Sequence, residues 1–257
     1  MHFHKYQGTG NDFIIIDNRD LQLDITSATS YLAQLCSRRF GIGADGFIAV
    51  EPSEAGDFRM RYLNADGNES TLCGNGTRCV VSFVHSLGII GSSCQVETSV
   101  GLIKAAIQGK EVKIQMPRPS GFKKLNETSF WIDTGSPHYV KYVNTELEKV
   151  DVATEGKKLR QHAAFESIGG TNVNFLSINT PGNLSVRTFE RGVEAETFSC
   201  GTGVTACAFV HHQLHPSLDR LNVDTLGGKL QVSIEQENGT PTVYLQGPAE
   251  FVFEGNI

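Results

Sequence analysis

The sequence lacks the features by which nucleic-acid-binding and membrane proteins are recognised. It has no run of Lys or Arg longer than two residues, and 28 Asp and Glu outnumber 22 Lys and Arg, for a formal charge of −6. Because a nucleic-acid-binding surface needs clustered basic side chains, we expect no nucleic-acid partner. The longest apolar runs, such as residues 13–16, are too short to span a bilayer, and the first residues lack the apolar core of a signal peptide. We therefore expect a cytoplasmic protein with no membrane partner.

Signatures of cofactor binding are also missing. None of the six cysteines forms a Cys-x-x-Cys pair, and the chain has no P-loop and no lysine in a recognisable cofactor setting. His211, His212 and His215 precede Pro216 at the end of a predicted helix, where histidine suits the negative end of the helix dipole. We interpret them as helix-terminus residues and expect neither a metal nor a cofactor.

Glycine is the residue type in excess, and several glycines belong to a repeated motif. The chain has 27 glycines among 257 residues, about a tenth, against a usual share of about 7%. The segment Cys73-Gly74-Asn75-Gly76 recurs as Cys200-Gly201-Thr202-Gly203, 127 residues later, and residues 96–103 recur at the same offset as residues 223–230. Two copies in the same order indicate a duplicated domain and not a long repeat array.

Strand and helix patterns follow the same order in both halves. Alternating and β-branched segments predict strands at residues 13–17, 58–64, 96–98, 102–107 and 112–116, and at 173–178, 184–190, 221–225, 229–234 and 242–246. Helical patterns cover residues 32–39, 80–87, 153–162 and 203–214. Short turns, at residues 108–110 and 238–239, favour antiparallel pairing. The simplest architecture is an α/β protein of the α+β type, with a mostly antiparallel sheet around one long helix in each half.

Proline and glycine at residues 117–121 mark the expected domain boundary. We expect an N-terminal domain of residues 1–117 that carries Cys73 and a C-terminal domain of residues 118–248 that carries Cys200. The last strand, at about residues 249–257, could return to the first domain, which the sequence by itself leaves open. We expect the active site in the cleft between the domains.

Each cysteine motif places a thiol at the beginning of a helix. Cys73 and Cys200 precede glycine-rich residues and then apolar helical runs, in which Cys79 and Cys207 are expected to lie in the core. At a helix N-terminus the dipole and the free amide groups stabilise an anion, which favours the thiolate over the thiol. The same amides can hold a carboxylate, and glycine lets a ligand approach the backbone.

Two such motifs, facing one another, suit inversion at a carbon next to a carboxylate. One thiolate would remove the α-proton from one face, and the opposite thiol would deliver a proton to the other face. A duplicated pair of motifs supplies the two bases that this reaction needs.

The motifs resemble those of diaminopimelate epimerases over essentially the whole chain. The resemblance rests on seven segments in order: residues 8–13, 41–46, 64–67, 73–76, 135–138, 190–192 and 200–203. It implies two pseudo-symmetric domains, each an antiparallel barrel-like sheet around a central helix, with the last strand in the first domain. It also implies a cofactor-independent interconversion of LL- and meso-diaminopimelate in the synthesis of lysine and peptidoglycan precursors, and a possible homodimer.

The resemblance further implies a role for individual residues. Cys73 and Cys200 would be the two acid–base groups, with Glu190 holding the ammonium of the reacting centre and His138 beside a catalytic cysteine. Four backbone amides would bind the carboxylate of the reacting centre: those of Gly74, Asn75, Gly201 and Thr202. Arg191 would clamp the distal carboxylate. Three side chains would bind the distal amino-acid head: Asn11, Asn64 and Asn172.

Two positions depart from the family pattern, and two other functions stay open. Gly46 and Ser136 stand where the family often has glutamine and asparagine, which affects peripheral contacts and not the cysteines. A proline or hydroxyproline racemase would use the same pair of cysteines but needs no arginine for a distal carboxylate, so Arg191 favours a longer substrate. In a redox-responsive binding protein, Cys73 and Cys200 would instead form a reversible disulfide.

Overall fold

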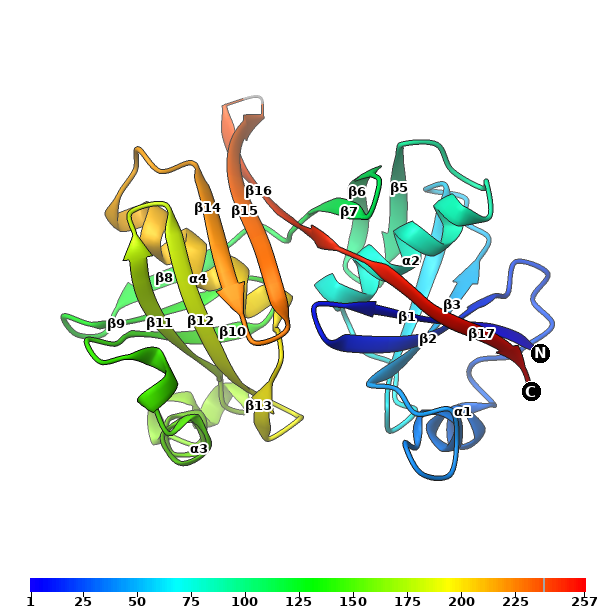
Figure 1. Ribbon diagram of the computed structural model, residues 1–257, viewed down its shortest axis with the longest axis horizontal. Coiled ribbons are helices and arrows are strands. Elements are labelled where there is room, and N and C mark those ends of the chain that lie inside the picture. Colours follow the sequence, from blue (N-terminus) through cyan, green and yellow to red (C-terminus); the bar gives the residue numbers. More distant parts are fainter. Residues whose placement is uncertain (238) are drawn as a thin grey trace. The chain divides into compact units, whose positions relative to one another are not determined.

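The computed structural model describes residues 1–237 and 239–257, so Asn238, in one of the expected turns, lies outside the described residues. The chain divides into two compact units. The first comprises Met1–Ile114 and Gly247–Ile257, and the second comprises Gln115–Gln246 (Figure 1). The division after Ile114 falls just before the proline-rich segment at residues 117–121, and the last residues of the chain belong to the first unit.

The first unit contains the helices α1 (Thr29–Cys36) and α2 (Gly74–Ser86). Its strands are β1 (His2–Gly8), β2 (Asn11–Asp17), β3 (Gly46–Glu51), β4 (Phe58–Asn64), β5 (Ser93–Thr98), β6 (Gly101–Gln108), β7 (Glu111–Gln115) and β17 (Glu250–Asn256). They are hydrogen-bonded in the order β17-β1-β2-β3-β4-β5-β6-β7. All neighbours are antiparallel except the pairs β2–β3 and β4–β5, which are parallel.

The second unit contains α3 (Val152–Arg160), α4 (Gly201–Leu214) and the short 3₁₀ helices η1 (Leu147–Lys149) and η2 (Ala163–Ile168). Its strands are β8 (Ser120–Lys124), β9 (Ser129–Asp133), β10 (Pro137–Tyr142), β11 (Asn172–Thr180), β12 (Asn183–Glu190), β13 (Ala195–Thr197), β14 (Arg220–Thr225), β15 (Gly228–Glu237) and β16 (Thr240–Pro248). They pair in the order β8-β9-β10-β11-β12-β14-β15-β16, with β13 also beside β12. The parallel pairs are β10–β11 and β12–β14.

The two units share one topology. A parallel pair needs a crossover connection, and in each unit the two crossovers contain the helices: α1 and α2 in the first, α3 and α4 in the second. Strand β17 at the edge of the first sheet corresponds to β8 at the edge of the second: β17 pairs with β1, and β8 pairs with β9. The last strand of the chain therefore completes the first sheet, beside the first strand (Figure 1).

A buried helix lies against the inner face of each sheet. Most residues of α2 are buried, and this helix contacts β1, β2, β3, β4, β6 and β17. Most residues of α4 are buried too, and it contacts β9, β10, β11, β12, β14 and β15. A helix that is buried on most sides must be largely apolar, as α2 is at residues 79–84 and α4 is at residues 206–210. The expected sheet around a central helix is confirmed in each unit, with the refinement that both sheets are mixed.

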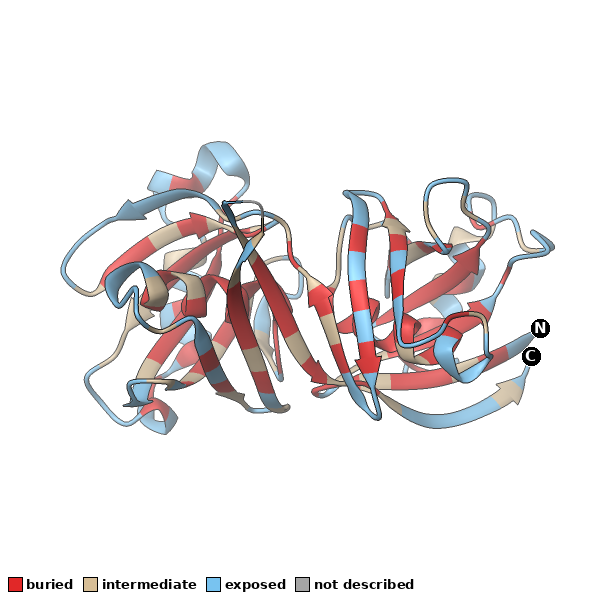
Figure 2. Ribbon diagram, turned by 90° about the horizontal axis from the view of Figure 1, so that it is seen from above, coloured by how far each residue is buried: buried red, intermediate tan, exposed pale blue. Residues whose placement is uncertain are grey.

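The shorter helices cover the outer faces. Leu32 and Leu35 of α1 pack with Phe47 and Ala49 of β3 in one apolar cluster, and α3 contributes Val152 to a matching cluster in the second unit. Buried residues run along the central strands, whereas β17 is largely exposed (Figure 2). None of the helices in the described residues is both long and apolar enough to cross a membrane.

The sequence patterns located most strands but missed six of them: β1, β3, β8, β9, β10 and β13. Every residue of β3 is buried, because α2 lies on one face of the sheet and α1 on the other. Such a strand has no alternation to detect. The helix α2 begins at Gly74 and not at residue 80, because the glycine-rich residues form its first turn. The parallel pairs were also not expected, since the turn lengths report only on the antiparallel hairpins.

Gly156 of α3 provides a test of this packing. An alanine in a helix is ordinarily about 1 kcal/mol more stable than a glycine. Here a Cβ atom would lie 2.7 Å from Cγ of the buried Phe189, and still closer to Phe189 Cβ. We expect Gly156→Ala to lower the free energy of unfolding by about 1–3 kcal/mol, because overpacking outweighs helix propensity. Urea unfolding measures this change. Gly182→Ala, where a Cβ would meet no atom within 4 Å, is the control and should be nearly neutral; a stabilised Gly156→Ala variant would contradict the packing.

Candidate active site

The structure places Cys73 at the N-cap of α2, as its motif predicts. Its backbone is extended, with φ −124° and ψ 109°, and the backbone N–H of Gly76 donates to its Sγ at 3.4 Å. The residues of the first turn, Gly74 and Asn75, are buried. The first amide groups of a helix have no partner within the helix, so this end is suited to a thiolate and to a bound carboxylate.

Asn11 joins the Cys73 motif through its amide oxygen. Oδ1 of Asn11 accepts a hydrogen bond from Nδ2 of Asn75 at 3.2 Å and lies 3.5 Å from Sγ of Cys73, whose thiol donates to it. Nδ2 of Asn11 donates to Asp45 at 2.8 Å. The expected site residues Asn11, Cys73 and Asn75 therefore form one hydrogen-bonded group in the first unit.

Asn64 lies at the end of β4, directly opposite Gly46 of β3. Its Oδ1 accepts a hydrogen bond from the hydroxyl of Tyr62 at 2.9 Å. A Cβ atom at Gly46 would lie 2.6 Å from the Tyr62 ring and 2.7 Å from the carbonyl oxygen of Leu63. The tyrosine ring thus fills the space of a side chain at position 46, which accounts for the glycine there and supplies a polar group beside Asn64.

Cys200 occupies the matching place at the N-cap of α4. Its backbone has φ −115° and ψ 110°, its side chain is buried, and its Sγ lies 3.4 Å from the hydroxyl of Thr202. The carbonyl of Thr202 accepts a hydrogen bond from the buried Thr134 hydroxyl at 2.9 Å, which ties this first turn to the β9–β10 turn. The backbone geometry of the two motifs is therefore alike, but the side chains around the two thiols differ.

His138 is wholly buried on β10 and is held by Asn174 of β11. Asn174 Nδ2 donates both to the carbonyl of Tyr139 and to His138 Nδ1, each at 3.1 Å, while its Oδ1 accepts from Thr188. Because Nδ1 accepts, the ring proton lies on Nε2, which is buried and has no hydrogen-bond partner among the described residues. Burial, with a smaller contribution from the charge of Arg191, lowers the pKa of His138 to about 3.

Asn172 and Arg191 are joined at the ends of β11 and β12. The backbone N–H of Arg191 donates to Asn172 Oδ1 at 2.9 Å, and Asn172 Nδ2 donates to Ser136 Oγ and to the carbonyl of Pro137. The Arg191 guanidinium donates to the carbonyls of Ile168 and Gly170. Ser136, one of the two departures from the family pattern, therefore accepts a bond within this group.

Glu190 closes β12, directly before Arg191. Its Oε2 accepts a hydrogen bond from the hydroxyl of Thr197 at 2.9 Å, and the side chain is partly exposed. In the second unit the structure thus brings Asn172, Glu190 and Arg191 to the same end of neighbouring strands.

The other four cysteines lie in the interior. Burial raises the pKa of Cys36 to about 11 and that of Cys94 to about 12, so both are thiols at neutral pH. Burial also raises the pKa of Cys79 and Cys207, which lie within α2 and α4. Their expected place in the core is confirmed.

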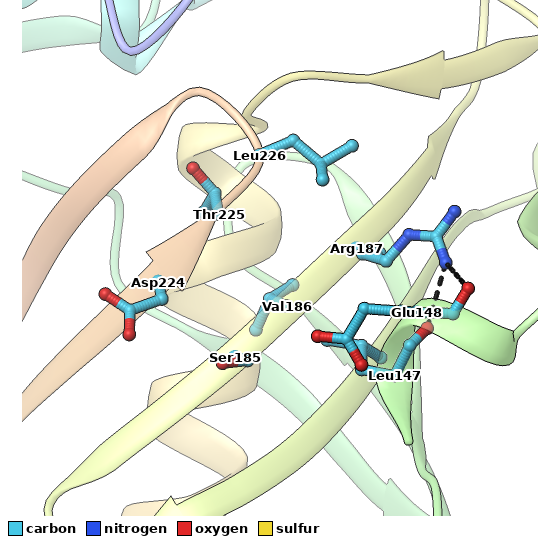
Figure 3. Close-up of a pocket in the computed structure, with 8 residues that line it drawn as sticks. All are labelled: Leu147, Glu148, Ser185, Val186, Arg187, Asp224, Thr225 and Leu226. Atoms are coloured by element: carbon cyan, nitrogen blue, oxygen red, sulfur yellow. Dashed lines mark hydrogen bonds between the residues drawn. The ribbon is translucent and has the colours of Figure 1, made fainter. Parts of the chain in front are cut away.

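Two cavities, of about 380 and 370 Å³, lie in the second unit, and neither is lined by a cysteine. The first such cavity is lined by Leu147, Arg187, Asp224 and neighbouring residues (Figure 3). Its arginine is already committed, since Arg187 donates to the carbonyls of Leu147 and Glu148 and pairs with Glu196. Neither a cysteine nor a histidine lines this cavity, so the hydroxyl groups of Ser185 and Thr225 have no histidine base there, and we assign the chemistry to the cysteine motifs.

Within the described residues, one cluster has the donor spacing of a metal site: His2, His4 and Glu254, whose ligand atoms lie within 4.8 Å of one another. It lies on β1 and β17 and includes none of the expected site residues. Of the histidines at the end of α4, His211 contacts Tyr142 and the Pro181 carbonyl, and His212 contacts the Leu218 carbonyl.

Sequence reasoning missed Arg78 and Asn174. Arg78 is wholly buried on α2 and donates to Asn75 Oδ1, and Asn174 is wholly buried beside His138. A Cβ atom at Gly203 would clash with Asn174 Oδ1, so this glycine allows the asparagine to approach the cysteine motif. The only available signal was the position of Arg78 in the motif that begins at Cys73, because nothing local marks a side chain as buried.

His138 should remain neutral over the physiological pH range. Its folded pKa of about 3 lies below the ordinary value of about 6.5, so the unfolded state binds a proton first as the pH falls. The stability that this group contributes is present above about pH 6.5 and is lost as the pH falls towards 3. We expect ¹⁵N NMR to show a neutral ring with the proton on Nε2 from pH 8 to pH 5. Titration of His138 near pH 6.5 would contradict its burial.

Comparisons with known proteins agree with this geometry. The family model described as diaminopimelate epimerase matches residues 3–120 and 130–252. The chain is 44% identical to the diaminopimelate epimerase of Flavobacterium psychrophilum over 260 residues, which cover 100% of both chains. It is 44% identical to that of Chlorobaculum tepidum, covering 97% of this chain and 98% of the relative, and 38% identical to that of Aquifex aeolicus, covering 100% and 98%.

Solved structures show the fold in more distant proteins. A phenazine biosynthesis protein of the PhzF family from Bacillus anthracis matches with a TM-score of 0.78 at 17% identity, covering 100% of this chain and 98% of the other. A probable proline racemase from Agrobacterium radiobacter matches with a TM-score of 0.72 at 14% identity, covering 100% and 92%. At these identities the solved structures establish the fold alone. The full-length relatives decide to which family of this fold the chain belongs. The chain belongs to the diaminopimelate epimerase family.

Proposed function

We propose that the chain interconverts LL- and meso-diaminopimelate by proton transfer between two thiol groups and the α-carbon, as an isomerase of lysine and peptidoglycan precursor synthesis. The observation that carries this proposal is the pair of cysteines at the N-caps of the two buried helices. A single motif of this kind would offer one base. Two motifs in duplicated units, in a chain that matches its relatives from end to end, offer the two bases that inversion requires.

In the proposed step, one cysteine enters as the thiolate and the other as the thiol. The thiolate takes the α-proton, the electron pair of the C–H bond remains on the α-carbon, and the thiol delivers its proton to the opposite face. The product has the inverted configuration, and Cys73 and Cys200 have exchanged protonation states. Because either can be the base, the same arrangement serves both directions.

The helix N-termini stabilise the charge that develops. Proton removal shifts negative charge from the α-carbon into the adjacent carboxylate, so donors aimed at that carboxylate bind the transition state more tightly than the substrate. We assign these donors to the backbone N–H groups of the two first turns: Gly74, Asn75, Gly201 and Thr202. Gly74 and Gly201 have no side chain to obstruct the approach of the carboxylate.

The remaining site residues fit the two heads of a diamino diacid. We assign the ammonium of the reacting centre to Glu190 and the distal carboxylate to Arg191, whose guanidinium is oriented by two backbone carbonyls. An asparagine amide can form four hydrogen bonds, two through its N–H groups and two through the lone pairs of its oxygen. Beyond the hydrogen bonds that they make within the protein, Asn11 keeps one N–H and Asn172 keeps one lone pair for a ligand. We assign these two groups and the side chain of Asn64 to the distal amino-acid head of the substrate. The Nε2–H of His138 is a further donor for the substrate or a thiolate.

The reaction is tested by proton NMR of LL-diaminopimelate in D₂O with the reduced protein. We expect the α-proton signal to decrease while the meso isomer appears.

Cys73→Ala and Cys200→Ala should each lower kcat by about 10²- to 10⁴-fold, because each removes an acid–base group. Cys94→Ala removes a buried thiol outside the site and is the matched control. Wild-type turnover in either variant would contradict the two-base assignment, and no exchange by the wild type would contradict the function.

A substitution of Arg191 tests whether the substrate is diaminopimelate or a shorter amino acid such as proline. We expect Arg191→Met to raise KM for diaminopimelate by about 10- to 100-fold, because a charged hydrogen bond contributes about 1.5–3 kcal/mol. Arg220→Met, at an exposed position on β14, is the control. Steady-state kinetics measure both variants, and proline is assayed in parallel. Exchange of the proline α-proton by the wild type, with KM unchanged in Arg191→Met, would instead favour a proline-type racemase.

The redox alternative differs in its response to substrate. In an epimerase, bound diaminopimelate protects Cys73 and Cys200 from alkylation, whereas a redox-responsive binding protein would need no such protection. Thiol titration with and without the diamino acid separates the two. A homodimer and a cytoplasmic location stay predictions from the sequence.

A further inference from the structure

Arg78 is a buried charge that the proposed mechanism does not use. Among the described residues it is the largest side chain with no exposed surface, and its guanidinium donates hydrogen bonds to three uncharged oxygens. An arginine stays protonated at neutral pH, and burying its charge among uncharged hydrogen-bond acceptors costs free energy of desolvation. Its presence in the core, one turn after Cys73, therefore calls for a function that offsets this cost.

Arg78 holds together three segments that meet at the beginning of α2. Its Nη1 donates to Oδ1 of Asn75 at 3.0 Å, its Nη2 to the hydroxyl of Thr9 at 3.2 Å, and its Nε to the carbonyl of Pro248 at 3.4 Å. Thr9 lies in the turn between β1 and β2 with a φ of 50°, and Pro248 precedes β17. A Cβ atom at Gly8 would lie 3.2 Å from Arg78 Nη2, so the guanidinium fits tightly against this turn.

The donors of Arg78 set the direction of a hydrogen-bond chain. A guanidinium can only donate, so the oxygen of the Asn75 amide must face it, and the Asn75 NH₂ group must face Asn11. At the other end Asp45, a carboxylate, can only accept, and it takes the NH₂ group of Asn11. Both amides are thus held in one orientation, and the oxygen of Asn11 is the atom that faces Sγ of Cys73 at 3.5 Å.

We propose that Arg78 is a positioning residue for the reaction: it fixes the amide orientations of Asn75 and Asn11 and so presents a hydrogen-bond acceptor to the thiol of Cys73. The proposal rests on the proposed function of Cys73 as an acid–base group. Without a donor-only group at position 78, the Asn75 amide can rotate by half a turn, while Asp45 still takes the NH₂ group of Asn11. In part of the molecules the two amide oxygens would then face one another, and their repulsion would move the Asn11 oxygen away from Sγ of Cys73.

Arg78→Met removes the donors but keeps most of the volume, and Arg78→Lys keeps a donor-only group. We expect Arg78→Met to lower kcat for diaminopimelate by about 100-fold, the loss expected of a misplaced catalytic group, with KM within threefold of the wild type. Arg78→Lys should recover at least tenfold of that loss. Arg61→Met is the control, because Arg61 is a partly buried arginine of the same unit that pairs with Glu69 and Glu51 and makes no part of this hydrogen-bond chain.

A second readout does not depend on the substrate. We expect hydrogen exchange of the Asn11 side-chain NH₂ protons, followed by ¹⁵N NMR, to become at least tenfold faster in Arg78→Met and to stay unchanged in Arg61→Met. Because Arg78 also bonds Thr9, two residues before Asn11, a purely structural role would speed exchange of the backbone amides of the β1–β2 turn as well, whereas the positioning role leaves those amides unchanged. A wild type that is inactive on diaminopimelate would refute the function, while this exchange measurement would still decide the role of Arg78.

Asn75→Asp tests the chain if Arg78→Met does not fold. The carboxylate pairs with Arg78 and keeps the backbone N–H, but it cannot donate to Asn11. We expect a folded protein whose kcat falls about 100-fold, as for a misplaced catalytic group. A folded Arg78→Met or Asn75→Asp variant with kcat within threefold of the wild type, or unchanged Asn11 exchange in Arg78→Met, would overturn the proposal.

Discussion

The burial of α2 and α4 is the constraint on which the rest of the structure depends. Each helix is covered by its sheet, so most of its side chains after the first turn are apolar, with buried exceptions such as Arg78, and its N-terminus is the end at which polar chemistry can occur. The first amide groups of each helix need partners from outside the helix. Placing a cysteine and glycines at this point gives both a thiol and room for a carboxylate.

Duplication repeats the backbone of the site but not its side chains. Cys73 and Cys200 have similar N-cap conformations, yet Cys73 faces an asparagine oxygen and Cys200 faces the hydroxyl of Thr202. Thr205 stands at the position in α4 that corresponds to Arg78 in α2, and its hydroxyl donates to the carbonyl of Gly201, one turn earlier in the same helix. A substrate whose two faces differ would meet two thiols in different surroundings, so the symmetry of the fold does not require symmetric roles.

The polar site residues already make most of their possible hydrogen bonds within the protein. Asn172 spends three valences on Ser136, Pro137 and Arg191, and Asn174 fixes the tautomer of His138. Such networks lose little entropy when a ligand binds, because their side chains are already ordered. The cost is that each of these buried groups depends on its neighbours, so the site and the surrounding fold are stabilised together.

The sequence by itself determined the duplication, the thiol at the beginning of each buried helix, most of the strands, and the chemistry that two such thiols allow. These features depend on residues close together in the chain, where periodicity and capping act. Only the tertiary structure decided that Arg78 is buried, that its partners include Pro248, that His138 is neutral, that Tyr62 fills the space beside Gly46, and that β17 pairs with β1. Burial, pKa and hydrogen-bond partners depend on residues far apart in the chain, 170 positions for Arg78 and Pro248 and 254 positions for His2 and Asn256, and no local pattern records which distant groups a side chain will meet.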